Sequence, residues 1–560
     1  MTATARALLR LAHEFGPGVA KRKLALVRSL DRAELATAAQ VRDLHEALLF
    51  IRAYPDSKAL FAAVDRVLAR FCRRKDLKRH AEALRDSGIA GTPLQYSYYQ
   101  RTAYWLAARW PRQLRLLWDE LRAPEQIEAR LPIFATFAET IALDELDLDL
   151  RVWIDHMRGE ETDATWLIRR CKHLALRGPL EEKFFEDMDL EIEIAPSPDG
   201  PSRTRGVDQM ARVVCRETPL KRARPDLRTE VERRPLAVRE VSPEEGQVYV
   251  DMAREAMLTR SRDLDAFAYG DANDVRLIDW EDGLTFALIG VIPERRLMLE
   301  AVYGWLTLQN GVPIGYVLTS ALCRSAEIAF NVFETFRDSE AAWVYSRVCA
   351  TVRALFDVDT FTIYPYQLGD GNDEGLESGA WWFYQKLGFR PKDRGALALM
   401  RKELAAMKRR PAHRSSIATL KRLAQHNMFL HLGEERDDVM GLLPNAAIGV
   451  TIAQLLGVIF GSQREKGEGA SAQMAANLFG ARTTEQWTPD EHLAWRRWGP
   501  LCILLHNVGR WTKAQRRALV DVVRKKGGRR EQEFVLAFDR HAKLRAALLQ
   551  LGRTADAKLD

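Results

Sequence analysis

The sequence predicts an α+β protein in which a central mixed sheet lies between two helical regions. Three observations predict this class. Apolar residues recur at helical spacing over residues 1–187, strand and helix patterns alternate over 241–404, and helical spacing returns over 405–560. Residues 188–240 connect the first two of these regions. The chain has 560 residues, which is too many for one hydrophobic core, and this length also indicates several domains.

The first region, 1–187, is expected to be all helical. Asp31 and Glu34 have the spacing of a capping box, in which an N-cap side chain and an N3 carboxylate satisfy free main-chain groups. We therefore expect a helix to begin near Asp31. The apolar residues that follow share one helical face: Val41, Leu44, Leu48 and Ile51.

The segment 188–240 reads as a short strand, a linker and a charged stretch. Apolar and acidic residues alternate over 188–194, which is typical of a strand with one wet face. Residues 195–206 are rich in Pro, Ser and Gly and predict a linker. Residues 216–235 are highly charged, and we expect them to be loosely ordered.

The middle region, 241–404, carries most of the strand signals. Ser242 and Glu245 again have capping-box spacing and predict a helix that runs to about Met257. Asn310-Gly311 favours a hairpin turn between two strands. The expected elements are strands at 296–308, 312–318 and 327–336, a helix at 343–356, a strand at 360–368, a short helix within 378–391 and a last strand at 396–404.

Positive charge is concentrated in the C-terminal region. From Lys408 to Asp560 there are 26 Lys+Arg against 15 Asp+Glu, a net charge of +11, and the rest of the chain carries −4. Basic residues alternate with tryptophan around Trp495, Trp498 and Trp511, a composition that could contact phosphates and stack on bases. No known motif organises these residues, so a solvated helix face is the competing interpretation.

Composition and motifs indicate a soluble cytoplasmic protein with no metal site. The six cysteines lie far apart without a C-x-x-C pair, which fits a reducing compartment and argues against a zinc ribbon. The best membrane candidate, 442–461, contains Pro444, Asn445 and Gln454, so we interpret it as a buried core helix. Arg6 and Arg10 interrupt the apolar N-terminal stretch, which therefore does not read as a secretory signal.

Two stretches of the middle region resemble a known family. Residues 382–389, WFYQKLGF, resemble the C-terminal signature of the GNAT superfamily of acyl-CoA N-acyltransferases. Residues 332–337, VFETFR, resemble the strand that precedes the pyrophosphate loop of that family. The resemblance covers roughly residues 240–404 and implies a GNAT-like sheet, acetyl-CoA or another acyl-CoA as co-substrate, and a small-molecule or protein amine as acceptor.

The resemblance also implies a set of coenzyme-binding residues. In the family, a glycine-containing loop and the helix after it bind the pyrophosphate through main-chain N–H groups. Here Glu340 replaces the central glycine, and Asp338 is a second departure. Either these carboxylates face solvent, or coenzyme A binds weakly or not at all, because negative charge opposes a pyrophosphate. The implied residues are Val332, Phe333, Arg337, Ser339, Ala341, Ala342 and Asn372.

Two residues are candidates for catalysis. Tyr384 stands where the family places the general acid that reprotonates the departing thiolate, although it could instead be a packed aromatic residue. Glu327 opens a strand where some members keep a general base, and its competing role is that of an exposed strand residue. Strand alternation places Glu327, Ala329, Asn331 and Phe333 on one face.

Three functions therefore remain open from the sequence. The first is an N-acyltransferase. The second is a GNAT-like binding or scaffold protein without catalysis, which the carboxylate at Glu340 favours. The third and weakest is nucleic-acid association through the basic C-terminal region.

Overall fold

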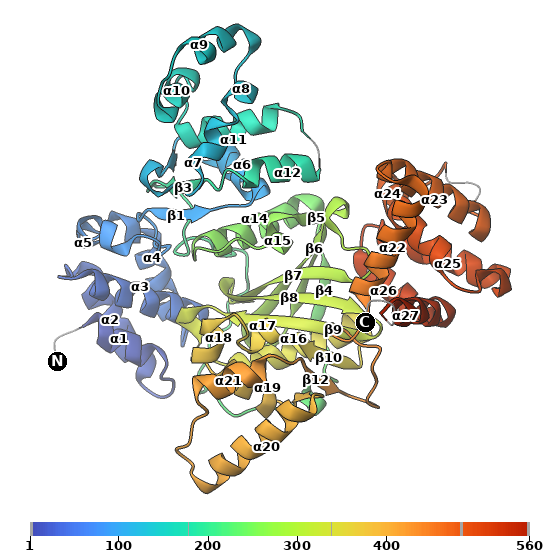
Figure 1. The fold of residues 1–560 in the computed structure, drawn as a ribbon. Helices are drawn as coiled ribbons and strands as arrows, with labels where there is room; N and C mark the ends of the chain where they lie inside the picture. Colours follow the sequence, from blue (N-terminus) through green and yellow to red (C-terminus); the bar gives the residue numbers. More distant parts are fainter. Residues whose placement is uncertain (1–3, 177, 338, 482–484, 557–560) are drawn as a thin grey trace.

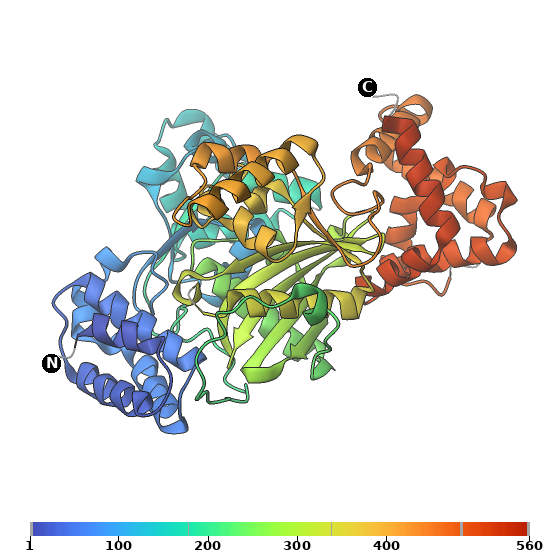
Figure 2. The same ribbon diagram turned by 90° about the horizontal axis from the view of Figure 1, so that it is seen from below.

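The computed structural model describes residues 4–176, 178–337, 339–481 and 485–556 (Figure 1). A central sheet lies between N-terminal and C-terminal helical regions, which stand on opposite sides of it (Figures 1 and 2). Helices account for 54% of residues and strands for 13%, which confirms the α+β class.

The first helices pack together beside the sheet. Their bounds are α1 Ala5–Ala12, α2 Val19–Arg32, α3 Ala38–Ala53, α4 Lys58–Ala69 and α5 Lys75–Arg79. The prediction of a helix start near Asp31 is wrong, because Asp31 lies in the last turn of α2. The next helix, α3, begins instead after Thr37, whose hydroxyl accepts a hydrogen bond from the Gln40 N–H at 3.3 Å.

The remainder of the first region contains a small sheet, so the all-helical prediction for 1–187 is wrong there. Strands β1 (Leu94–Ser97) and β2 (Leu114–Leu116) pair antiparallel with β3 (Glu191–Ile194), which lies between them. The strand predicted over 188–194 is confirmed by β3, but its acidic face is not wet, because Glu191 is buried and Glu193 is half-buried. Strands as short as β1 and β2 leave no measurable alternation in the sequence. The helices here are α6 Gln100–Arg109, α7 Pro124–Glu128, α8 Leu131–Phe134, α9 Thr140–Glu145, α10 Leu150–Met157, α11 Asp163–His173 and α12 Pro179–Glu186.

The segment predicted to be a linker packs tightly. Ser202 and Thr204 are buried, and Arg203 forms an ion pair with Glu46 of α3 at 2.6 Å. Its high content of Pro, Ser and Gly therefore gives an irregular path rather than a free tether.

The central sheet has nine strands in the order β11-β12-β10-β9-β8-β7-β6-β5-β4. Neighbouring strands are antiparallel except β9 and β10, which are parallel. The strand bounds are β4 Ala237–Glu240, β5 Gly270–Asp279, β6 Leu284–Val291, β7 Ala301–Gln309, β8 Val312–Leu322, β9 Ser325–Val332, β10 Thr360–Ile363, β11 Arg390–Pro391 and β12 Met428–His431.

The last strand predicted for the middle region is wrong. Residues 396–404 belong to α20 (Arg394–Arg409), whose N-cap Asp393 accepts a hydrogen bond from the Ala396 N–H at 2.7 Å. The strand that completes the sheet is β12, which comes from the region expected to be all helical and lies between β10 and β11. The intervening α21 spans Ile417–Ala424.

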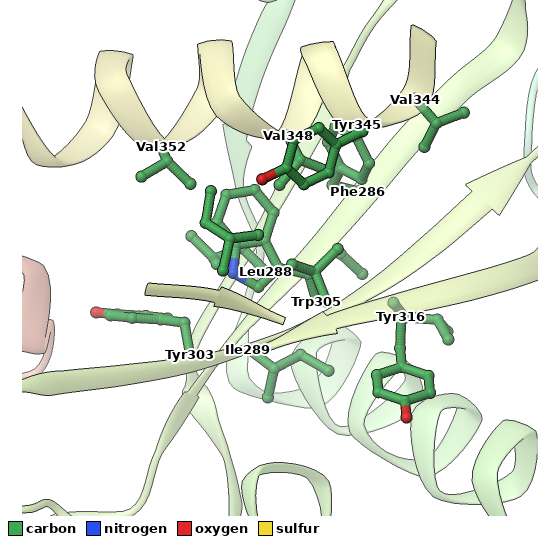
Figure 3. Packing of buried hydrophobic residues seen from close by; sticks show 14 of the residues in the cluster. Phe286, Leu288, Ile289, Tyr303, Trp305, Tyr316, Val344, Tyr345, Val348 and Val352 are labelled. Carbon is green, nitrogen blue, oxygen red and sulfur yellow. The ribbon is translucent and has the colours of Figure 1, made fainter. Parts of the chain in front are cut away.

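Helices cover the two faces of the sheet differently. Helix α16 (Ala341–Phe356) packs Val348 and Val352 over Phe286 and Trp305, as Figure 3 shows. Helices α14 (Pro243–Leu258) and α15 (Asp265–Ala268) lie against the opposite face. The start predicted for α14 is confirmed, because the Ser242 hydroxyl accepts from the Glu245 N–H at 3.2 Å. The short helices that remain are α13 Leu227–Glu230, α17 Pro365–Leu368, α18 Asp373–Glu377 and α19 Ala380–Lys386.

Replacing Gly246 of α14 with alanine is expected to lower the free energy of unfolding by about 2 kcal/mol or more. A Cβ at this position would overlap the carbonyl oxygen of Ala272 in β5, so helix and sheet would have to separate. Gly449, also helical, has open space around it, and its change to alanine is expected to stabilise by about 0.5–1 kcal/mol. Urea denaturation of both variants measures the difference, and equal effects would contradict the close helix–sheet contact.

The C-terminal region is a set of helices that docks on the sheet. Their bounds are α22 Asn445–Phe460, α23 Arg464–Phe479, α24 Pro489–Leu504, α25 Lys513–Lys526, α26 Glu531–Arg540 and α27 Ala542–Asp556. Arg296, just before β7, donates hydrogen bonds to the carbonyls of Lys526 at 2.9 Å and Gly528 at 2.6 Å. The Trp498 indole donates to the carbonyl of Met298 at 2.9 Å.

Helix α22 is not the buried core helix that the sequence predicts. Only Ala447, Ile448 and Leu456 are buried, and Val458 is 88% exposed. Within the described part of the chain, no single helix qualifies as a membrane span by length and hydropathy. Helices α22 and α23 qualify only as a pair, and that pair is bent by 101°.

Candidate functional site

Strands β9 and β10 separate partway along their length. They pair at only three positions, the last of which joins Glu327 to Thr362. Strand β9 continues to Val332 and stays paired with β8 to its end. The side of β9 that faces β10 therefore loses its strand partner after Glu327.

The phenol of Tyr384 reaches this unpaired side of β9. Tyr384 lies on α19, and its oxygen accepts a hydrogen bond from the main-chain N–H of Phe330. Its ring packs against Tyr345 of α16, with centroids 5.6 Å apart, and against Phe389 at 5.8 Å. Because the side chain is only 3% exposed, burial raises the pKa of Tyr384, and the phenol stays protonated at neutral pH.

The face of β9 that carries Glu327 is partly covered. Glu327, Ala329 and Asn331 are half-buried, as are Leu318 and Ser320 on the neighbouring β8. The opposite face of the same strands is packed under α16, where the Phe330 ring contacts Tyr345 at 5.3 Å. The sequence-based prediction placed Glu327, Ala329, Asn331 and Phe333 on one face. The first three are half-buried residues of β9, whereas Phe333 lies just beyond the strand and is buried.

Glu327 lies close enough to Glu300, which precedes β7, to be affected by its charge. Burial, and then the charge of Glu300, raise the pKa of Glu327 to about 7. Tyr364, at the end of β10, is close enough to both carboxylates for their charges to add to the effect of burial, which raises its pKa. Among the described residues, neither carboxylate forms an ion pair, and Asn445 donates to Glu300 at 3.4 Å. Such a group exchanges its proton near neutral pH.

The first turn of α16 is covered by the chain itself. Glu340, the N-cap residue, is 8% exposed and forms an ion pair with Arg216 at 2.8 Å. It also accepts a hydrogen bond from the main-chain N–H of Lys221 at 2.6 Å. Ser339 is buried, and its hydroxyl donates to the carbonyl of Phe336 at 2.6 Å. Glu340 thus points inward and is neutralised, while Asp338 lies outside the described residues.

The other residues predicted to bind the coenzyme do not form one cluster. Phe333 and Arg337 line a cavity on the side of the first helical region. Asn372 caps α18, accepting from the Gly375 N–H at 3.1 Å. Val332 ends β9, whereas the half-buried Ala341 and Ala342 begin α16.

The structure therefore brings Glu327 and Tyr384 to the same strand, on either side of the point where β9 and β10 separate. Sequence reasoning missed Glu300 and Tyr364, since only the sheet register places them near Glu327. It also missed the arginines that surround Phe333 and Arg337, two of which follow the end of α14 at Arg260 and Arg262. The sequence LTRSRD at 258–263 was the one available signal.

No metal centre is found in the part of the chain that the structure describes, where no group of three or more His, Cys, Asp or Glu side chains is arranged to hold an ion. Comparison with family models, with curated proteins and with solved structures gives no match to this chain.

Proposed function

We propose that the protein is an acyl-CoA-dependent N-acyltransferase that transfers an acetyl or other acyl group to an amine. The observation that carries the proposal is the position of the half-buried Glu327, beside the point where β9 leaves β10 and Tyr384 approaches. The order strand, loop, helix, strand and helix from β9 to α19 supports a GNAT-like sheet. The family resemblance of residues 332–337 and 382–389 supports the same function.

The proposed chemistry assigns one proton transfer to each residue. Glu327, with a pKa of about 7, takes a proton from the acceptor ammonium group, directly or through a water molecule. The free amine attacks the thioester carbonyl, the carbon–sulfur bond breaks, and the amide nitrogen releases its surplus proton to solvent, from which the Tyr384 phenolate is reprotonated after turnover. Tyr384 is the protonated donor for the departing thiolate. The separation of Glu327 from Phe330 along β9 is roughly 10 Å, enough for a thioester and an amine to lie between the two groups.

Two observations favour a second function, a GNAT-like binding or scaffold protein without catalysis. The first turn of α16 is covered by Arg216 and Lys221, and Glu340 stands where the family has glycine. Tyr384 is also buried rather than open to solvent. The nucleic-acid alternative has less support, because Trp495, Trp498 and Trp511 are 1–6% exposed and unavailable for stacking.

Calorimetric titration with acetyl-CoA and free coenzyme A separates the two functions. A saturable signal at micromolar concentration is expected for the acyltransferase. No binding at millimolar concentration would exclude the acyltransferase and favour the binding or scaffold protein. Thiol release in the presence of a panel of primary amines then measures turnover. Tyr384→Phe is expected to lower turnover roughly a hundredfold or more while preserving coenzyme binding. Tyr366→Phe, which removes an exposed phenol, is the matched control and is expected to have no effect.

A further inference from the structure

A cavity of about 340 Å³ lies between the first helical region, the loop after α14 and the end of β9. Phe333, Asn331 and Thr335 form part of its floor. We name this cavity the arginine pocket after the six arginines that line it. They are Arg42, Arg85, Arg203, Arg260, Arg262 and Arg337.

Four of the six arginines are held in place by carboxylates. Arg203 pairs with Glu46, and Arg85 pairs with Glu193 at 2.6 Å. Arg262 and Arg337 share one carboxylate, that of Glu374. Such pairing fixes the orientation of the remaining N–H groups before any ligand arrives, and the single carboxylate of Glu374 leaves the Arg262–Arg337 pair with a net positive charge.

Arg260 has no such partner. Within the described part of the chain it forms no ion pair, and its Nη1 donates to the carbonyl of Ala256 at 2.8 Å. Its guanidinium lies 3.7 Å from the centre of the Phe333 ring. Burial, and then the neighbouring Arg203 cation, lower the pKa of Arg260. Arg42 is exposed on the rim and is also outside the described ion pairs.

Two carboxylates line the pocket without pairing with Arg260 or Arg42. The carboxylate of Asp86 accepts a hydrogen bond from the main-chain N–H of Gln95 at 2.7 Å, and burial raises the pKa of Asp86. Glu334 is exposed. In the described ion pairs, Arg260 and Arg42 are therefore the two lining cations without a carboxylate partner.

Gly88 allows two of the segments around the pocket to be in close contact. Gly88 has φ +68°, and a Cβ there would overlap the carbonyl oxygen of Thr259, next to Arg260. The loop at 85–87 can press against the end of α14 only because residue 88 lacks a side chain. The cavity is thus bounded by elements that touch directly, rather than by a loose gap between regions.

We infer that the arginine pocket binds a phosphate ester or diphosphate of a small molecule, with Arg260 as the central contact. A phosphate can carry two negative charges, enough to match Arg260 and Arg42 together, whereas a carboxylate carries one. The planar fork of arginine suits phosphate oxygens, and the cavity volume is that of a small-ligand site. The Phe333 ring adds an apolar surface for the organic part of the ligand.

Calorimetric titration of the full chain with inorganic pyrophosphate tests the inference, with acetate as the carboxylate comparison. Saturable binding of pyrophosphate is expected, with acetate much weaker. Arg260→Gln is expected to weaken pyrophosphate binding at least tenfold, because a charge-assisted contact is lost. Arg42→Gln is expected to weaken it severalfold. Arg401→Gln, an exposed arginine on α20, is the matched control and should leave the affinity unchanged.

The inference fails if pyrophosphate does not bind at millimolar concentration, or if it binds Arg260→Gln and the unchanged protein equally. Should Arg260→Gln not fold, unchanged affinity in the exposed variant Arg42→Gln overturns it. Competition with coenzyme A identifies the source of the phosphate. Mutual displacement places the diphosphate of an acyl donor in the pocket, and independent binding indicates a separate phosphorylated ligand. The family resemblance also assigns Phe333 and Arg337 of this pocket to coenzyme binding, but pyrophosphate binding needs neither Glu327 nor Tyr384, so the inference can fail or hold independently of catalysis.

Discussion

Replacing Lys526 with methionine is expected to lower the free energy of unfolding by about 3–5 kcal/mol. The Lys526 ammonium lies 2.6 Å from the carboxylate of Glu531, and the two side chains are 4% and 0% exposed. Burial lowers the pKa of Lys526 and raises that of Glu531, so each charge depends on the other. Lys526 also donates to the carbonyls of Leu299 at 3.3 Å and Glu300 at 2.9 Å. The substitution therefore weakens the contact between the C-terminal region and the sheet.

Two companion variants show whether burial causes this loss. Lys525→Met removes a more exposed lysine that pairs with Asp521 one turn away, and it is expected to cost less than about 0.5 kcal/mol. Lys526→Met combined with Glu531→Gln should recover much of the loss, because no unpaired charge remains buried. Urea denaturation followed by tryptophan fluorescence measures all three. Equal stability of the Lys525 and Lys526 variants would contradict the assignment.

Replacing Glu327 with glutamine is expected to stabilise the protein increasingly as the pH rises from 4.5 to 7. The pKa of Glu327 is about 7 in the folded state, against an ordinary value of 4.5. Between these values the folded protein holds a proton that the unfolded chain has released, so the contribution of Glu327 to stability falls as pH rises from 4.5 to 7. Glutamine does not ionise, so the variant lacks this pH-dependent fall in stability. The variant should gain up to about 3 kcal/mol over the unchanged protein above pH 7 and almost nothing below pH 4.5.

The measurement is the free energy of unfolding at pH 4.5, 6 and 8 for both proteins. Glu334→Gln, which changes an exposed carboxylate just beyond β9, is the matched control. Glu300→Gln is expected to lower the pKa of Glu327, because it removes the neighbouring charge. A stability difference that does not vary with pH would show that Glu327 titrates normally, and it would remove the physical basis for a general base there.

Local patterns in the sequence predicted several elements of the fold correctly. The Ser242 cap, the strands around the Asn310-Gly311 turn and the helix that became α16 depend on neighbouring residues alone. The error over 396–404 arose because a short apolar stretch fits both periods. The segment is helical because Asp393 caps its N-terminus and because its buried residues have helical spacing; they are Ala396, Met400 and Glu403.

The candidate site was predictable only in part. Strand alternation gave the face of Glu327, and the family resemblance gave Tyr384. The sequence did not reveal that Glu340 is buried in an ion pair with Arg216, because these two residues are far apart in the chain. The segment that supplies Arg216 had the composition of a loosely ordered stretch.

What the sequence determined by itself was therefore local: the α+β class, the caps, and the alternation that puts Glu327 and Asn331 on one face. Only the tertiary structure determined which charged side chains lie close to one another. The pKa of Glu327 depends on Glu300 across the sheet, and the arginine pocket joins Arg42 and Arg260 from opposite ends of the chain's first half. Electrostatic interactions depend on distance and burial, and neither quantity is encoded by the spacing of residues along the sequence.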